Sequence, residues 1–505
     1  MKLPQFMAPG KAPVPSSSGS TCGEAQQSAP SLKMYYVALA IVLTAILIPI
    51  WIVDYPGMVD YPNHLARCYI LAHYHDNPFW QQLYYLDYTP LPNLAMDAIV
   101  APLAKLLPIL LCGKLFLSLS AVLFVVGCSA VGRVVTGRPN WLALVAAFTF
   151  YNSELFWGFL NCVFGMGVFL CVFAYWMRVR NAMTPLRFCI CGLLSIVAFL
   201  AHLSSVSFLY AACFTVALLE FIRDRKFSRL LVKLAWLIFP VLLMAAFMKG
   251  SGHIGHASFE FGIMKLVNLL APVNSYSVAV DAAVIAVLLI CLLVILKRCR
   301  IHSVAAAGLV LLALSLVCPP EVLTASGVDA RFVVPGYLLL VLSIEPFWDR
   351  WRKAAIATAI GAMMLHTASI AAHWRAIDHA SKQVLAMGEV LPAKASVYVL
   401  QLTSHKWTKS NKVLIHDVQL WAVTHEADVS ILWALHGQQP LVFRTLPCAG
   451  PDWARCFSTY DYVFTYEPTE PMLKILHGMA APASSWDKAT LWRMSSPAGS
   501  GSASP

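Results

Sequence analysis

Hydrophobic residues occur along this chain in long runs, and short polar segments separate them. A run of about 20 apolar residues is long enough to cross a lipid bilayer as a helix. We predict eleven such spans, at residues 34–53, 114–132, 140–157, 159–177, 188–203, 205–222, 230–248, 278–296, 303–320, 332–348 and 355–373. The chain is 59% hydrophobic and 12% charged over 505 residues, which excludes a soluble protein. The predicted fold class is an all-α polytopic membrane protein.

Lysine and arginine lie mostly in short clusters between alternate predicted spans. The clusters fall at residues 133–138, 178–187, 223–229, 297–300 and 350–353. Such clusters normally face the cytoplasm, which places the N-terminus inside and the C-terminus outside a cytoplasmic (inner) membrane. The net charge of +11 therefore reflects membrane topology, and we expect no nucleic acid partner.

The composition divides the membrane part of the chain into two regions. Residues 1–33 are rich in Ser, Pro and Gly and are predicted to be a disordered cytoplasmic N-terminus. Residues 34–373 form the predicted transmembrane domain, with a long first outer loop at 54–112. Within this loop residues 93–111 are apolar but are interrupted by two prolines and a lysine, so we expect an outer juxtamembrane helix there.

The remainder, residues 374–493, has the pattern of a small extracytoplasmic α/β domain. A helical apolar pattern covers 376–391, and alternating strand patterns follow at 395–402, 460–466 and 488–493. Cys448 and Cys456 could form a disulfide if this domain lies outside. Residues 494–505 are rich in Ser, Gly, Ala and Pro and are predicted to be a disordered tail.

The first candidate for chemistry is Asp60, in Val-Asp-Tyr-Pro-Asn-His-Leu-Ala-Arg at residues 59–67. Ionisable groups at a membrane boundary cost free energy to hold, so their clustering favours a functional site. The Asp60 carboxylate could act as a general base that takes a proton from an acceptor hydroxyl or amine. Alternatively, it only caps the helix that begins near Pro62, because Asp and Pro suit a helix N-terminus.

Two other acids compete with Asp60 or complement it. Asp54 either is the catalytic base or simply ends the first span in water. Asp97 could be a second, substrate-binding acid, and an acid pair would favour a divalent cation with oxygen ligands. The alternative for Asp97 is an acid that faces the outer water layer. No cysteine spacing indicates a zinc or redox site.

His64 and Arg67 follow Asp60 by four and seven residues, so the three share a face if the helix starts by residue 61. An acid, an imidazole and a guanidinium on one face could hold a phosphate beside the base. The alternative is an interfacial helix whose polar side faces water, with Arg67 reaching to the surface.

Later outer segments supply further candidates for substrate binding. Arg331 opens a late span at its outer end, where a cation calls for an anionic partner such as a lipid phosphate or Asp329. His253, His256 and Lys265 lie in a glycine-flanked outer loop and are weaker candidates. The two histidines could chelate a metal, but no third ligand lies near them in the sequence. Glu154 and Asn161 could also line a cavity at this end, as the last candidates.

These features resemble the GT-C superfamily of integral membrane glycosyltransferases, which includes protein mannosyltransferases and lipid A aminoarabinose transferases. The resemblance covers residues 34–373 and is carried by three motifs. These are the acid of Asp60-Tyr-Pro-Asn-His-Leu-Ala-Arg67, the turn Gly132-Arg-Val-Val-Thr-Gly-Arg138, and Arg331-Phe-Val-Val-Pro335. The acid is not in the Asp-Glu or Asp-x-Asp form of some branches, which leaves open both metal dependence and the identity of the base.

The resemblance implies a transferase that takes a sugar from a polyprenyl-phosphate-linked donor. The sugar would pass to an extracytoplasmic lipid, glycan or protein acceptor by an inverting displacement. It implies Asp60 as the general base and Arg331 as a contact of the donor phosphate. The alternatives are a transporter or flippase, or a non-catalytic partner of a polysaccharide assembly system. A transporter would need ionisable groups deep in the spans, where the sequence has few besides Asp281.

Overall fold

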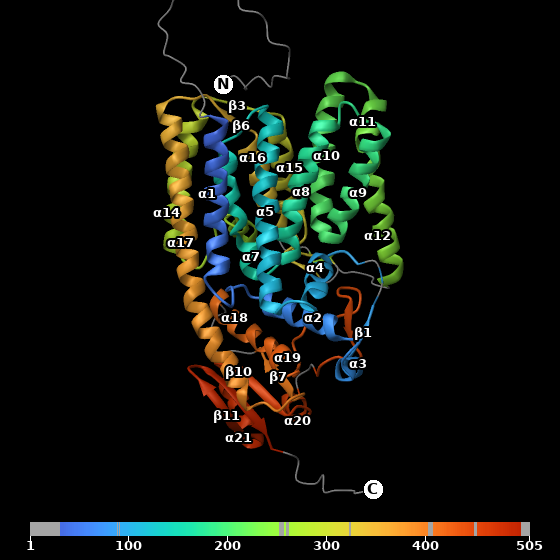
Figure 1. Ribbon diagram of the computed structural model, residues 1–505, viewed down its shortest axis with the longest axis vertical. Helices are drawn as coiled ribbons and strands as arrows, with labels where there is room; N and C mark the ends of the chain where they lie inside the picture. The colour runs from blue at the N-terminus through green and yellow to red at the C-terminus, as the bar shows by residue number, and fades with distance from the viewer. Residues whose placement is uncertain are drawn as a thin grey trace, which may run out of the picture.

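The computed structural model describes residues 31–87, 89, 91–251, 257–258, 262–322, 325–401, 408–448 and 452–495. Long helices form one bundle, and a smaller mixed domain lies against the end of the bundle opposite the start of the chain (Figure 1). Most of the predicted disordered ends, 1–33 and 494–505, lie outside the described residues. We refer to the two ends of the bundle as the N-terminal end and the domain end.

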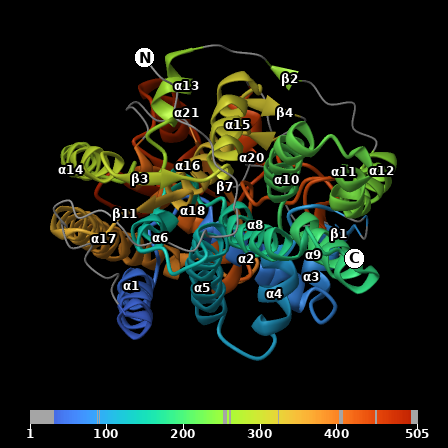
Figure 2. The same cartoon turned by 90° about the horizontal axis from the view of Figure 1, so that it is seen from above.

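The bundle is built from apolar helices that match the predicted spans. They are α1 (Leu32–Trp51), α5 (Ile109–Thr136), α8 (Leu160–Val179), α9 (Pro185–Ala201), α10 (Leu203–Asp224), α11 (Phe227–Leu234), α12 (Ile238–Ser251), α14 (Val278–Leu296), α15 (Val304–Val317), α16 (Val333–Leu342) and α17 (Arg350–Ala386). Viewed from above, α8 lies between α14 and α17 on one side and α11 and α12 on the other (Figure 2). It is also the most deeply buried of the long apolar helices in the described chain.

Seven described helices are long and apolar enough to cross a membrane, counting α11 and α12 as one and extending α17 to Val390. Shorter apolar helices occupy Ala95–Ala104, Pro185–Ala201, Val304–Val317 and Ala330–Leu342. The chain is thus a multi-pass membrane protein, and the number of eleven spans stays a prediction.

The segment 140–157 is not the single helix that its hydropathy predicts. It contains α6 (Leu142–Ala147), η1 (Phe148–Phe150) and α7 (Ser153–Trp157). Asn152 begins α7, because its side chain accepts hydrogen bonds from the backbone N–H groups of residues 154 and 155. Gly158 ends α7 in a left-handed conformation with φ of 87°. Polar capping within an apolar run therefore overrides the span pattern.

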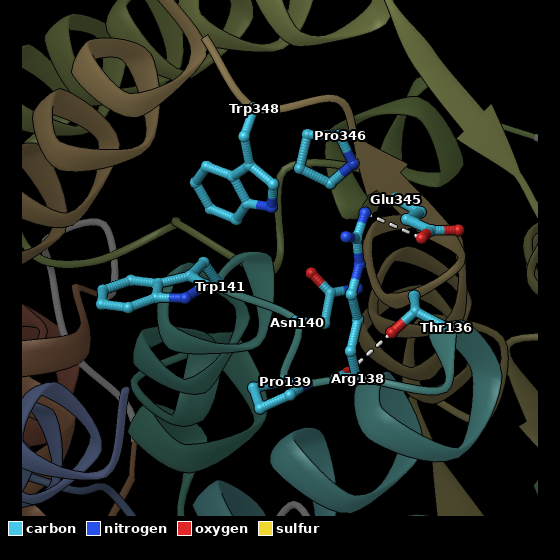
Figure 3. A pocket seen from close by; sticks show the side chains of 8 residues that line it. All are labelled: Thr136, Arg138, Pro139, Asn140, Trp141, Glu345, Pro346 and Trp348. Atoms are coloured by element: carbon cyan, nitrogen blue, oxygen red, sulfur yellow. Dashed lines mark hydrogen bonds and ion pairs between the residues drawn. The ribbon is translucent and has the colours of Figure 1, made fainter. Parts of the chain in front are cut away.

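The predicted turn at 132–138 is also shorter than expected, because α5 continues to Thr136 and ends at Gly137, whose φ is 75°. Arg138 forms an ion pair with Glu345 at 2.9 Å (Figure 3). The Asn140 side chain donates to the carbonyls of Leu342 and Ile344. These contacts lie at the N-terminal end of the bundle and surround a small cavity that Thr136, Arg138 and Glu345 help to line (Figure 3).

The segment predicted to be the first outer loop folds at the domain end of the bundle. It contains α2 (Tyr61–His73), α3 (Pro78–Leu83), β1 (Tyr84–Leu86) and α4 (Ala95–Ala104). Helix α4 is the short element expected at 93–111, and it packs on α2 before the chain enters α5 (Figure 1). Strand β1 pairs antiparallel with β9 (Leu441–Phe443), which joins the loop to the C-terminal domain.

The C-terminal domain is an α/β unit around a five-stranded sheet in the order β11-β12-β10-β7-β8. Its strands are β7 (Ser396–Leu400), β8 (Asp428–Val429), β10 (Tyr462–Tyr466), β11 (Ala480–Trp486) and β12 (Ala489–Met494). Its helices are α18 (Lys409–Asp417), α19 (Trp421–Thr424), α20 (Trp453–Ser458) and α21 (Glu470–Met479). The three predicted strands correspond to β7, β10 and β12.

Two connections of this domain bear on its position. The last predicted span and the helix expected at 376–391 are one continuous helix, α17, which runs from the bundle into the domain (Figure 1). The boundary proposed at residue 374 therefore falls inside a helix. Cys448 and Cys456 form a disulfide, as predicted.

Candidate functional site

Asp60 lies where the bundle, the first outer loop and the C-terminal domain meet. It occupies the N-cap position of α2, yet its side chain makes no capping hydrogen bond. Its backbone N–H donates to the carbonyl of Trp157 at 3.2 Å, and that of Val59 donates to the carbonyl of Phe156 at 3.0 Å. Asp60 is only 5% exposed. A carboxylate that is buried and makes no capping hydrogen bond does not fit the alternative that Asp60 only caps the helix.

Gly158 makes this arrangement sterically feasible. A Cβ atom on Gly158 would lie 2.5 Å from the Asp60 nitrogen and 2.8 Å from its Cβ, which is closer than real side chains approach. The left-handed φ of 87° also disfavours any other residue. The end of α7 and the start of α2 are therefore in direct backbone contact at Asp60.

Helix α18 of the C-terminal domain contributes a second layer to the site. The Nδ1 atom of His416 lies 3.5 Å from Oδ1 of Asp60. The Lys412 ammonium lies 4.6 Å from the centre of the Trp157 ring, and that of Lys409 lies 5.2 Å from the centre of the Phe156 ring. One face of α18 thus covers α7 and Asp60 with two ammonium groups and an imidazole.

Burial dominates the electrostatics of Asp60 and His416. It raises the pKa of Asp60 to about 8, opposed by the charge of Lys412. Burial lowers the pKa of His416 to about 4, and Lys412 acts in the same direction. Burial of the two groups favours the proton on the carboxyl, whereas attraction between the charges formed 3.5 Å apart favours its transfer to the imidazole.

The face shared by His64 and Arg67 points into protein. Arg67 is 2% exposed and makes two hydrogen bonds to Asp97, from Nε at 2.8 Å and from Nη2 at 3.0 Å. Nη2 also lies 3.0 Å from Nδ1 of His64. Burial lowers the pKa of His64, and the charge of Arg67 adds to this, so the imidazole is neutral and accepts from Arg67.

This cluster corrects two expectations about exposure. Asp97 does not face the outer water layer, and Arg67 does not reach to the surface, because each is buried against the other. The cluster joins α2 to α4 and so restrains the helix whose N-cap is Asp60. Substrate binding by His64, Arg67 and Asp97 stays a prediction.

Arg331 lies on the side of the α7–α8 connection opposite Asp60. Its guanidinium carbon is 5.0 Å from the centre of the Phe159 ring, and Nη2 donates to the carbonyl of Ser326 at 2.9 Å. Its Nε is buried without a hydrogen-bond partner in the described part of the chain, and so is Oε2 of Glu154. The Glu154 carboxylate is close enough to interact electrostatically with Arg331.

Asp329 is not the partner of Arg331. Its Oδ2 instead pairs with Nζ of Lys265 at 3.0 Å, and its Oδ1 accepts from the backbone N–H of Ala330. Lys265 is buried in this ion pair rather than held in an open loop. His253 and His256 lie outside the described residues.

The segment from Glu154 to Phe159 therefore connects the two halves of the site. Gly158 touches Asp60, and the Phe159 ring lies against Arg331. The structure brings Asp60 and Arg331 to the same short segment although 270 residues separate them in the sequence.

Asp54 lies apart from this arrangement. Its side chain is 60% exposed and pairs with Lys382 at 2.6 Å and Lys114 at 3.9 Å. The hydrogen bond from Lys382 lowers the pKa of Asp54 below its ordinary value. An exposed carboxylate held by two lysines is a weaker proton acceptor than Asp60.

An apolar groove of about 900 Å³ lies between α10, α11, α12 and α15. Its lining is dominated by aromatic and aliphatic side chains, including Tyr210, Phe214, Leu314 and Phe332. Phe332, which lines the groove, follows Arg331 directly in the sequence.

The sequence did not single out Lys409, Lys412 or His416. Their spacing of three and four residues places them on one face of a helix. This spacing is the sequence feature from which the group could have been recognised. In the described residues no three His, Cys, Asp or Glu side chains group together as a metal site. The described side chains therefore do not form a divalent-cation site, and the reaction proposed below has no step at a metal ion.

Comparisons with known proteins give a similarity of fold. No protein-family model matches this chain, and no curated protein matches it. The crystal structure of ArnT from Cupriavidus metallidurans bound to undecaprenyl phosphate is similar, with a TM-score of 0.54 and 11% sequence identity. The similarity covers 92% of this chain and 98% of that chain. It shows that this chain and that protein share a fold.

Proposed function

We propose that this protein is a membrane glycosyltransferase that moves a sugar from a polyprenyl-phosphate-linked donor to an acceptor outside the cytoplasmic membrane. The observation that carries the proposal is Asp60, a buried carboxylate that caps no helix and lies beside the α7–α8 connection. The fold similarity to ArnT, whose crystal structure contains undecaprenyl phosphate, supports the lipid-linked donor.

The orientation follows from charge and from the disulfide. The Arg and Lys clusters predicted to be cytoplasmic include Arg138 and Arg352, which form ion pairs away from the C-terminal domain. The Cys448–Cys456 disulfide suits an oxidising compartment. We therefore infer that the domain end, with Asp60, is extracytoplasmic.

The donor would occupy the arginine side of the site. Its polyprenyl chain suits the apolar groove beside Phe332, and its phosphate suits the buried guanidinium of Arg331. A guanidinium with an unpartnered N–H can donate to a phosphate oxygen and offset the charge that develops as the phosphate leaves.

The acceptor would approach Asp60 from the aqueous side. Asp60 takes the proton of the acceptor hydroxyl or amine while the acceptor atom forms a bond to the anomeric carbon. The bond from that carbon to the phosphate oxygen breaks in the same step, and the lipid phosphate leaves with the electron pair. One base and one displacement invert the anomeric configuration.

A transporter or flippase fits the buried charges less well. Asp60 and the Arg67–Asp97 pair lie in or against the first outer loop rather than midway along the long helices. A non-catalytic partner of an assembly system would keep this fold without needing the Asp60 carboxylate.

The test compares cells that carry the wild-type protein, a deletion or Asp60→Asn at equal membrane levels. Mass spectrometry of envelope glycans and lipid-linked sugars is the measurement. We expect Asp60→Asn to match the deletion, with one glycan losing a sugar and its lipid-linked donor accumulating. Asp76→Asn, which changes an exposed acid of the same loop, is the matched control and should match the wild type.

A deletion phenotype that Asp60→Asn does not reproduce would overturn the transferase proposal. The protein would then act in transport or assembly, and Asp60 would hold only a structural position. Loss in both Asp60→Asn and Asp76→Asn would indicate that the loop as a whole, rather than one carboxylate, is required.

A further inference from the structure

His416 of the C-terminal domain lies beside the candidate base. Its Nδ1 lies 3.5 Å from Oδ1 of Asp60 and, in the part of the chain that the structure describes, has no hydrogen-bond partner. The His416 side chain is 13% exposed and that of Asp60 is 7% exposed. Both side chains are thus largely buried where they meet.

Asp60 needs such a neighbour if it is to act as a base near neutral pH. A buried carboxyl whose pKa is about 8 is mostly protonated there, and a protonated carboxyl cannot accept another proton. Lys412 favours the ionised form, but an ammonium already carries its proton and cannot take the one on Asp60. An imidazole can take it.

We propose that His416 is the proton acceptor of Asp60, so that a residue of the C-terminal domain completes the catalytic base of the membrane domain. The proposal rests on the proposed transferase function. Before transfer, the proton on Asp60 moves to Nδ1 of His416 and leaves a carboxylate beside an imidazolium. During transfer, the acceptor gives its proton to Asp60 as the phosphate leaves the sugar. The imidazolium then releases its proton to water, and the pair returns to its starting state.

The position of α18 makes the pairing specific. Its first turn is fixed by a capping box, in which Asn411 and Thr408 exchange hydrogen bonds of 2.8 and 3.2 Å. Lys409 donates to Oδ1 of Asn274 at 2.9 Å and to the carbonyl of Ser275 at 2.8 Å. The helix is therefore tied to the membrane domain one turn before Lys412 and two turns before His416.

Other charged groups act on the pair to different extents. Lys412 of α18 is the charge that affects both Asp60 and His416. Helix α2 contributes His64, which is neutral and turned to Arg67. Helix α17 contributes Asp378 and Lys382, which pair with each other at 2.8 Å. The buried carboxyl of Asp417 follows His416 on α18.

The first test is the pH dependence of transfer in membranes that contain the variant His416→Gln. Glutamine keeps much of the size and polarity of histidine but cannot take a proton. We expect the rate to fall by about tenfold near pH 6.5, because a carboxyl with a pKa of about 8 is only a few per cent ionised there without help. Near pH 9 the rate should recover to within about twofold, because Asp60 ionises there without His416. His425→Gln, in the same domain but bonded to Thr424, should behave as the wild type.

The second test needs no substrate. Infrared spectra of the detergent-purified protein report the C=O band of a protonated carboxyl, and Asp60→Asn identifies the part that belongs to residue 60. In the wild type, part of this proton resides on His416, so the band should be weaker at pH 7 than in His416→Gln.

The outcomes separate this inference from the transferase proposal. An equal loss of rate at every pH in His416→Gln, with an unchanged carboxyl band, would overturn the proton-acceptor role and leave Asp60 as the base. A changed band in a protein whose Asp60→Asn variant still transfers sugar at the wild-type rate would uphold the pair and overturn its catalytic use.

Discussion

The buried pair of Arg67 and Asp97 allows a sharp test of how α2 is held. Arg67 is 2% and Asp97 is 7% exposed, and two hydrogen bonds of 2.8 and 3.0 Å join them. Asp97→Asn would keep the shape of the side chain and remove its charge. The guanidinium would then be buried without a counter-ion, and removing one partner of a buried ion pair costs about 3–5 kcal/mol. We expect a loss of unfolding free energy in that range.

Equilibrium unfolding of the purified protein, by titrating sodium dodecyl sulfate into mild detergent micelles, would measure this loss. Tryptophan fluorescence reports the transition. The double variant Arg67→Met, Asp97→Leu replaces both charges by apolar groups of similar size. We expect it to be more stable than Asp97→Asn, because no unpaired charge remains. Asp76→Asn, at an exposed position, should change the free energy by less than about 0.5 kcal/mol.

Two results would refute the reasoning. A loss below about 1 kcal/mol in Asp97→Asn would mean that water reaches the guanidinium. Additive effects of the two single apolar variants in the double variant would mean that the residues do not interact. The transfer rate of the double variant then distinguishes the two hypotheses for Arg67. A stable but inactive double variant would support substrate binding, and an active one would support a purely structural pair.

Three further predictions concern the contact between α7, α2 and α18. Gly158→Ala should lower the transfer rate at least about tenfold, since a left-handed alanine costs about 1–3 kcal/mol and its Cβ would displace Asp60. Lys409→Met should speed amide hydrogen exchange in α18, because its bonds to Asn274 and the neighbouring carbonyl are lost. Burial raises the pKa of Asp417 to about 7, so stability falls as pH rises from about 4 to 7. Asp417→Asn should therefore raise the unfolding temperature at pH 8 and change it little at pH 4.

The hydropathy pattern located most of the membrane helices because the bilayer fixes both their length and their composition. It failed at 140–157, where Asn152 and Gly158 act through side-chain capping and a left-handed backbone. Neither effect changes the average hydropathy of the segment. It also placed a domain boundary inside α17, because the helix continues after its apolar stretch ends and its packing, rather than its hydropathy, decides where it stops.

The contacts within the candidate site were predictable only where its residues are neighbours in sequence. The motif from Asp60 to Arg67 is local, so its residues could be singled out together. The pairing of Arg67 with Asp97 depends on how α4 packs on α2, and sequence spacing contains no such information. His416 is more distant still, and only the folded domain brings it to Asp60. The spacing of Lys409, Lys412 and His416 places them on one face of a helix. It does not show which residues that face contacts.

The way α2 is held explains why the C-terminal domain matters to the base. Asn63, three residues after Asp60, donates to the carbonyl of Ile431 at 3.0 Å and accepts from the N–H of Trp433 at 2.9 Å. The bundle holds the same helix through the backbone of α7, and α4 holds it through Asp97. Each contact alone would leave α2 free to tilt, whereas the three together restrain the carboxylate of Asp60. Precise placement of a base requires such restraint, because proton transfer depends steeply on distance. The domain therefore belongs to the site through its backbone as well as through α18.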